Sequence, residues 1–190
     1  MANAKRRCRK CKEYELVENG MIINNAFYCS DKCMTSYAID QSTKLRAKRE
    51  RADIRKEKER IKTKADYLRD AQQAFNAFIR ERDMGLPCIS CGTTKPGIQY
   101  AAGHYKTCGG SPELRFDEKN VHRQCNQYCN MQLSGNLLEY RKGLIERYGM
   151  EIVDYLESYH EPKNYTIDDI KEITKKYRAK TRELKKQKVA

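Results

Sequence analysis

The sequence predicts a mostly helical α+β protein, in which a small N-terminal zinc finger and a larger zinc-containing core are joined by a long charged helix. Three observations support this fold class: two quartets of cysteines, a highly charged stretch without Gly or Pro at residues 43–64, and apolar residues at helical spacing around the second quartet. We expect a four-cysteine finger at 1–38, a basic helical linker at 39–82, the zinc core at 83–162 and a basic C-terminal helix at 163–190.

The composition limits the core and points to a polyanionic partner. Of 190 residues, 39% are hydrophobic and 34% are charged, so a large apolar core is excluded and bound metal is expected to help the fold. A net charge of +13 favours nucleic acid as the partner, although a basic surface without a ligand is the alternative. No apolar run is long enough to span a membrane.

The start of the chain has no apolar signal stretch, so we expect an intracellular protein. In that compartment paired cysteines favour metal over disulfides. The first quartet is Cys8, Cys11, Cys29 and Cys33, whose two pairs suit a tetrahedral zinc site. Strand-like residues around the turn signal Asn24-Asn25 predict a hairpin, and a short helix is expected at 31–38. The finger is also a basic patch, formed by Lys5, Arg6, Arg7, Arg9 and Lys10.

The middle of the chain predicts two different helices. Residues 43–64 carry apolar side chains too sparsely for a buried face, which predicts a solvated helix, with a disordered basic tether as the alternative. Residues 67–79 instead place apolar side chains on one helical face, so this helix should pack on the domain that follows. Those side chains are Leu68, Ala71, Phe75, Phe78 and Ile79.

The second quartet consists of Cys88, Cys91, Cys125 and Cys129, which predicts a second structural zinc ion. Between its pairs, strands are expected at 98–101 and 114–117, and the three-residue spacing of the second pair predicts a bulged helix start. The extra Cys108 is expected to be a free thiol, the alternative being that it replaces Cys125 or Cys129. Further helices are expected at 137–148, at 152–159 and from the Thr166 cap to 188, the last with a phosphate-binding basic surface.

Three polar residues near this quartet have the chemistry of a hydrolytic site. His104, at the end of the first strand, can act as a base toward water. Asn120, expected at the end of the second strand, can hold the hairpin loop and orient the imidazole, and Asn130 offers an oxygen to a divalent cation. A purely structural role is the alternative. The Gly109-Gly110 pair lacks the Lys-Ser/Thr of a phosphate loop, which argues against a nucleotide-hydrolysing site.

This pattern resembles the HNH, or ββα-metal, endonucleases. His104, Asn120 with Cys125, and Cys129-Asn130 stand at their first, second and third signature positions. The arrangement is especially similar to phage endonuclease VII, a Holliday-junction resolvase with a four-cysteine zinc site. The resemblance implies a zinc-stabilised, treble-clef-like ββα-metal nuclease core at 83–162 that uses Mg²⁺ or Mn²⁺.

The chain is also similar to the lambdoid phage NinG, or Rap, family over nearly its whole length. The similarity is carried by Gln124-Cys125 and by the runs Ala102–Tyr105, Leu114–Phe116, Asn120–His122 and Leu133–Asn136. It implies a structure-selective endonuclease for branched DNA, such as Holliday junctions and D-loops, in phage recombination. It further implies a phage- or prophage-encoded protein in the bacterial cytoplasm, with homodimers and a recombination-protein partner at the finger as further expectations.

The expected ligands of the catalytic cation differ from those of many HNH sites, because Gly103 stands where an Asp commonly binds the metal. We expect Asn130 to bind it, with Asp117 or His122 as a further ligand. His122 alternates with Asn120 along a strand, which suggests an accessory catalytic residue, and a half-buried structural histidine is the alternative. Gly103 also keeps open a different function, that of a non-catalytic zinc-finger protein that binds branched or single-stranded DNA as a recombination accessory.

Overall fold

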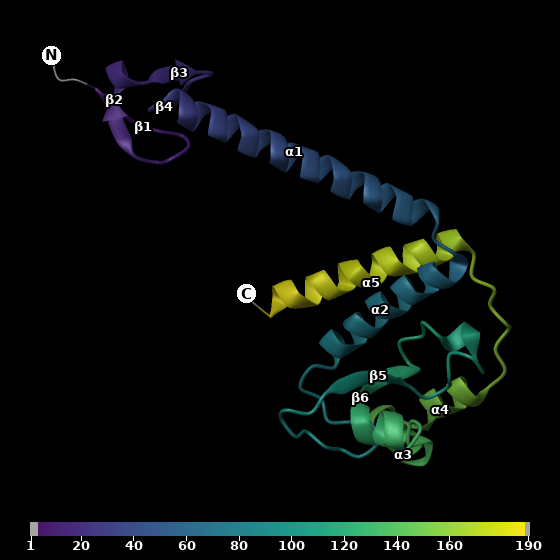
Figure 1. Cartoon of the computed structure of the whole chain (residues 1–190). Coiled ribbons are helices and arrows are strands. Elements are labelled where there is room, and N and C mark those ends of the chain that lie inside the picture. Colours follow the sequence, from purple (N-terminus) through teal and green to yellow (C-terminus); the bar gives the residue numbers. More distant parts are fainter. Residues whose placement is uncertain (1–3, 189–190) are drawn as a thin grey trace. The chain divides into compact units, whose positions relative to one another are not determined.

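The chain forms two compact units, one up to Ile61 and one from Lys62 onward, in a computed structural model that describes residues 4–188 (Figure 1). The outer ends of two expected segments, residues 1–3 and 189–190, lie outside the described residues. The division at Ile61 lies inside the expected linker of 39–82, so the second half of that linker belongs to the compact second unit.

The first unit is built from short antiparallel strands around the first cysteine quartet. Strand β1 (Lys5–Arg7) pairs with β2 (Tyr14–Leu16), and a 3-10 turn, η1 (Val17–Asn19), leads to β3 (Met21–Ile23) and β4 (Ala26–Tyr28). Asn24 and Asn25 join β3 to β4 with φ of 47° and 63°. Two left-handed residues in sequence suit a tight hairpin turn, so the predicted hairpin is confirmed.

Helix α1 (Asp31–Arg60) is a single helix of 30 residues. The helix expected at 31–38 was therefore predicted too short. Residues 31–60 contain no Gly or Pro that would end it, so the helix continues into the charged stretch. Ser30 caps its start by accepting a hydrogen bond from the backbone N–H of Cys33. None of the side chains from Asp31 to Arg60 is buried, as expected for a solvated helix.

The second unit begins with α2 (Lys64–Arg82), which lies beside the C-terminal helix α5 (Ile167–Gln187) (Figure 1). Both helices start with a capping box, formed by Thr63 with Asp66 and by Thr166 with Asp169, and the second confirms the predicted cap. Helix α2 buries the predicted apolar face. Helix α5, expected to be a basic arm, also contributes an apolar seam to this core: Ile170, Ile173, Tyr177 and Leu184.

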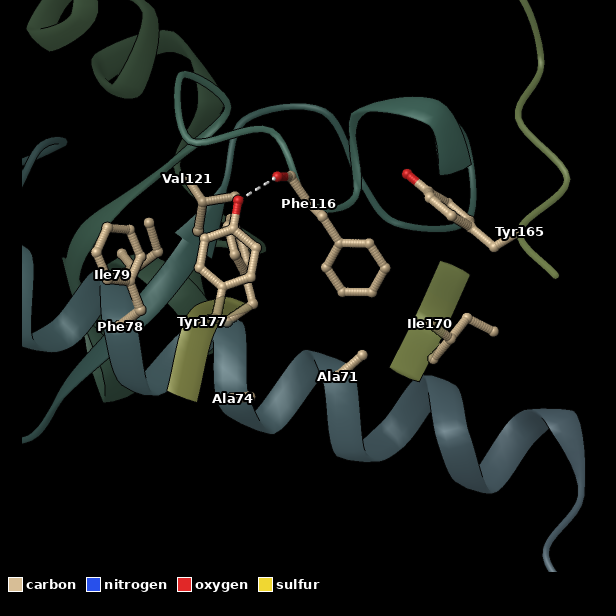
Figure 2. Close-up of a cluster of buried hydrophobic side chains, with 10 residues drawn as sticks. Ala71, Ala74, Phe78, Ile79, Phe116, Val121, Tyr165, Ile170 and Tyr177 are labelled. Atoms are coloured by element: carbon tan, nitrogen blue, oxygen red, sulfur yellow. Dashed lines mark hydrogen bonds between the residues drawn. The ribbon is translucent and has the colours of Figure 1, made fainter. Parts of the chain in front are cut away.

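Aromatic rings fill the core between these helices and the rest of the unit (Figure 2). The Phe75 ring packs edge-on against Phe116 and Tyr177, with ring centroids 5.7 Å and 4.7 Å apart. The Tyr177 hydroxyl donates to the Phe116 carbonyl at 3.2 Å, the bond drawn in Figure 2. This hydrogen bond ties α5 to the loop before β6, so α5 helps to hold the central hairpin.

The central hairpin pairs β5 (Tyr100–His104) with β6 (Val121–Cys125) in antiparallel register. The strand expected at 114–117 is absent from this described segment, because a 3-10 turn, η2 (Pro112–Leu114), and a further turn closed by Asp117 occupy it. Pro112 lacks a backbone N–H for a strand ladder and suits the first position of the turn. Asn120 consequently lies just before the second strand instead of at its end.

The other face of the hairpin is covered by α3 (Leu137–Tyr148) and α4 (Met150–Glu157). Their buried side chains, Tyr140, Leu144, Val153 and Leu156, pack with Tyr105 of the hairpin loop. The hairpin is therefore held between two helical layers, with α2 and α5 on one side and α3 and α4 on the other. Among the described residues, no helix combines the length and apolar character needed to cross a bilayer.

This arrangement predicts which fragment folds. Residues 62–188 contain both helical layers and should unfold cooperatively with one zinc ion bound, whereas residues 83–162 lack α2 and α5 and expose the apolar face of the hairpin. Thermal unfolding followed by circular dichroism, with zinc present, compares the two fragments. A cooperative transition of 83–162 at the same temperature as 62–188 would show that the two outer helices are dispensable.

Candidate functional site

The second cysteine quartet has the geometry of a zinc site. The Sγ atoms of Cys88, Cys91, Cys125 and Cys129 all lie within 4.8 Å of one another, and those of Cys91 and Cys125 are 3.8 Å apart. A tetrahedral zinc ion with Zn–S bonds of about 2.3 Å requires S–S distances of about 3.8 Å. Backbone N–H groups donate to Cys88 Sγ and Cys125 Sγ at 3.3 Å, so both sulfurs are hydrogen-bond acceptors.

The first quartet repeats this local structure. Cys29 Sγ lies 3.6 Å from the Sγ atoms of Cys11 and Cys33. In each quartet the fourth residue after the first cysteine has a positive φ, 71° at Lys12 and 67° at Gly92. Its backbone N–H donates to the carbonyl of that cysteine. Both quartets therefore fit zinc. They are similar in the spacing of their cysteines and also in these backbone hydrogen bonds.

The segment after Cys125 is a π-helix, η3 (Asn126–Gln132). This confirms the bulge expected from the three-residue spacing, because the wider turn accommodates one extra residue between the two ligands. Cys125 caps this helix through its sulfur, which accepts from Cys129 N–H. The remaining thiol, Cys108, lies outside both quartets and is 3.7 Å from Gln72 Oε1, in agreement with a free cysteine.

His104 is the last residue of β5 and faces α2. Its Nε2 lies 3.1 Å from the carbonyl oxygen of Arg115, and its ring lies 6.4 Å from that of Phe75. A carbonyl oxygen only accepts, so this contact assigns the hydrogen to Nε2 and the lone pair of the neutral imidazole to Nδ1, and the Ala102 backbone is a second hydrogen-bond partner of the ring. Burial lowers the pKa of His104 below its ordinary value of 6.5. The ring is therefore neutral near pH 7 and can accept a proton.

Asn120 holds the loop that follows His104. Its fully buried amide donates to the carbonyls of Lys106 and Leu114 at 2.9 Å and 3.0 Å and accepts from Lys106 N–H at 2.7 Å. These bonds close the loop across the end of the hairpin. The His104 imidazole is oriented by Arg115, and Asn120 acts on it only through the loop backbone.

His122 lies on the opposite face of the hairpin from His104, because it pairs with Gly103 whereas His104 pairs with Val121. It is 2% exposed, stacks on Tyr148 and lies near the ion pair of Arg82 and Asp83. Burial and the nearby Arg82 charge lower the pKa of His122 to about 4. The structure does not bring the two histidines together, and these surroundings favour a structural role for His122.

The expected cation ligands also lie in separate hydrogen-bond networks. Asp117 accepts from the Tyr155 hydroxyl of α4 at 2.7 Å and from Lys119 N–H at 2.8 Å. Asn130 donates from Nδ2 to Asn126 Oδ1 at 3.2 Å, which leaves its own Oδ1 as the available ligand atom. Within residues 4–188, the two cysteine quartets are the only groups of three or more Cys, His, Asp or Glu arranged to hold a metal.

A metal-binding Asp does not fit at Gly103. A Cβ at this position would lie 2.3 Å from Gln124 Oε1, and Gln124 is fully buried. The amide of Gln124 is fixed by bonds to Ser90 Oγ at 2.7 Å and the Gly135 carbonyl at 2.6 Å. Sequence reasoning assigned Gln124 no structural role, although a polar residue two positions from His122 on the same strand was the available signal.

Comparisons with known proteins agree over nearly the whole chain. The family model described as "Bacteriophage Lambda NinG protein" matches residues 1–187. The chain is 40% identical to "Protein ninG" of Escherichia phage lambda over 198 residues, covering 96% of this chain and 94% of the relative. It is 40% identical to "Protein ninG" of Salmonella phage P22, with 96% and 95% covered. No solved structure matches the chain.

The quartets predict a zinc content of two ions per chain. Cys88→Ser should lose one ion and unfold the second unit, since ligand binding and folding are linked in small zinc sites. Cys108→Ser is the matched control and should keep both ions because its sulfur is outside the quartets. Native mass spectrometry reads the stoichiometry, and a Cys108→Ser protein with one zinc ion would contradict the ligand set.

Proposed function

Because this chain belongs to the bacteriophage NinG family, we propose that it is a structure-selective DNA endonuclease that cuts branched recombination intermediates such as Holliday junctions and D-loops. The single observation that carries the proposal is the state of His104. A neutral imidazole at the end of a rigid hairpin, with its hydrogen directed to a backbone carbonyl, is a group prepared to take a proton from water.

In this mechanism Nδ1 of His104 takes the proton as water attacks the phosphorus atom. The imidazolium that forms keeps its Nε2–H on the Arg115 carbonyl, so the ring does not need to turn during the reaction. The products expected for this reaction carry 5′ phosphate and 3′ hydroxyl ends. The nearby Arg115 side chain adds positive charge, which favours the neutral imidazole and suits a phosphate.

The scaffold for this step is anchored at both ends of the hairpin. The second quartet would hold the end that contains Cys125, and the Asn120 amide closes the end that contains His104. Rigid placement of a base within hydrogen-bonding reach of its proton is the main requirement for general-base catalysis. Loss of either anchor would therefore lower the rate by displacing His104.

The proposal includes Mg²⁺ or Mn²⁺, and the described residues fit only a cation that takes most of its ligands from DNA and water. Asn130 Oδ1 is available to such an ion, whereas a carboxylate cage is not assembled. Magnesium commonly binds through few protein groups together with substrate phosphates. When bound, the cation would stabilise the charge that develops on the leaving 3′ oxygen.

Charge supports DNA as the substrate. The chain has a net charge of +13, and α5 presents Lys and Arg on the side away from its apolar seam. The finger adds a small hollow of about 270 Å³ whose lining includes four basic residues: Arg6, Arg7, Arg9 and Lys12. Contacts of this kind bind phosphates and favour recognition by shape over sequence. A homodimer, and a recombination protein that binds the finger, remain parts of the proposal.

The second candidate is a non-catalytic zinc-finger protein that binds branched or single-stranded DNA as a recombination accessory. The observation that favours it is the separation of Asp117, His122 and Asn130 into different networks. Both candidates bind DNA, so binding does not distinguish them. Metal-dependent cleavage of a labelled four-way junction does, since only the endonuclease cuts.

His104→Ala should reduce the cleavage rate of a four-way junction by about 10²- to 10⁴-fold, the typical effect of losing a general base. Junction affinity should change little, because a neutral imidazole adds little to a surface dominated by Lys and Arg. Single-turnover cleavage with Mg²⁺ or Mn²⁺ gives the rate, and fluorescence anisotropy gives the affinity.

His160→Ala is the matched control for this substitution. His160 bonds the Tyr155 carbonyl at the end of α4, outside the hairpin, and should keep the wild-type rate. Zinc content and melting temperature show whether each variant is folded. Wild-type cleavage by a folded His104→Ala protein would eliminate His104 as the base.

The cleavage rate should also depend on pH in a specific way. Burial lowers the pKa of His104 below 6.5, so the base form persists as pH falls through that value. The midpoint of the acid limb should therefore lie below pH 6.5, because the rate declines as the imidazole becomes protonated. Single-turnover rates at saturating protein give the profile, and a midpoint above pH 7 would contradict the buried base.

A further inference from the structure

A groove of about 560 Å³ opens beside the second cysteine quartet. Its walls come from the loop that contains Cys91 and Thr93, from the segment before β5 and from the π-helix η3. The volume lies within the range of about 300–1,000 Å³ that is usual for small-molecule sites. The groove is separate from the His104 loop, so the proposed cleavage step leaves it unexplained.

The lining has the chemistry of a nucleobase site. It combines the ring of Tyr128, which is 56% exposed, with Ile98 and the ammonium group of Lys95. Amide side chains supply both hydrogen-bond donors and acceptors, as the edges of bases require: Gln99, Asn126, Gln127 and Gln132. An exposed aromatic ring provides a stacking surface, and a lysine at the rim suits the phosphate attached to the base.

A second groove of about 730 Å³ meets the first at Tyr128 and Cys91. Glu139 and Glu146 line it together with Lys142 and Arg147, so its charge is mixed. Carboxylates beside a phosphate are repulsive. The first groove has Lys95 and no carboxylate among its described lining residues, so it is the better site for a nucleotide.

We propose that the groove beside the second quartet binds an unpaired DNA base, with Tyr128 stacked on it and the neighbouring amides bonded to its edge. The base must be unpaired because a ring inside a duplex is covered on both faces and cannot reach a surface tyrosine. Unpaired bases occur in single strands and at branch points. The inference rests on the proposed function in so far as DNA is the substrate, and it adds how the protein recognises a branch.

The test is the affinity of the full-length zinc-loaded protein for a short single-stranded oligodeoxynucleotide, with a duplex of the same length as reference. Tyr128→Ala should weaken single-strand binding by about 5- to 150-fold, the effect of losing one base–aromatic stacking contact. Duplex binding should stay within about twofold, because duplexes are bound through phosphates. Tyr128→Phe should preserve single-strand binding, since it keeps the ring.

Tyr159→Ala is the matched control, because Tyr159 is 82% exposed and lies outside the groove. Zinc analysis of each variant verifies that the second quartet still binds its ion. Unchanged single-strand affinity of a zinc-loaded Tyr128→Ala protein would overturn the inference and favour a protein partner for the groove. Equal losses on single strand and duplex would also overturn it.

The outcomes separate this inference from the endonuclease proposal. If the wild-type protein cuts junctions and Tyr128→Ala binds single strands normally, only the groove inference fails. If the wild-type protein cuts no junction but its single-strand affinity depends on Tyr128, the groove inference stands and the endonuclease proposal fails.

Discussion

The second unit depends on four cysteine sulfurs that bring a loop and the start of the π-helix η3 together. Cys88 and Cys91 come from a loop, whereas Cys125 ends β6 and Cys129 lies in η3. A bound zinc would hold these segments together where the sequence offers few apolar side chains. Backbone N–H groups donate to two of these sulfurs, those of Cys88 and Cys125.

From this anchor the hairpin sorts its residues onto two faces. His104 faces α2 and α5, and His122 and Gln124 face α3 and α4. Polar groups fill the second face. Among them is the Asp83 carboxylate, which forms an ion pair with Arg82 and accepts a hydrogen bond from the backbone N–H of Arg123. Hydrogen bonds among these buried groups make the face rigid, although Gln124 Oε1 and Arg123 Nε have no partner among the described residues. Rigidity there would steady the strand whose partner presents His104.

The two zinc modules share a backbone pattern but differ in their surroundings. The second joins one end of a hairpin whose faces are covered by helices, whereas the first is followed by α1, which buries none of its side chains from Asp31 to Arg60. A solvated helix that is predominantly basic suits contact with phosphates better than a protein core. In the proposed function the compact unit carries the chemistry, and the basic finger and helix hold DNA.

Local patterns in the sequence were sufficient to predict the two cysteine quartets, the hairpin turn and most of the helices. Cysteine spacing predicted both quartets and the bulge after Cys125, the Asn24-Asn25 pair predicted its turn, and Thr166 predicted the start of α5. These features depend on interactions between residues close in the chain, such as capping bonds and left-handed turn residues. They can therefore be recognised before the fold is known.

Only the tertiary structure decided how distant segments share the core and the site. Lys and Arg dominate the composition of α5, yet its seam of Ile170 and Tyr177 became part of the core because α2 presents Phe75 opposite it. The strand register placed His104 and His122 on opposite faces, and the Gln124 side chain closed the space beside Gly103. Strand pairing and packing join residues far apart in the chain, so their outcome depends on the whole fold and not on any local pattern.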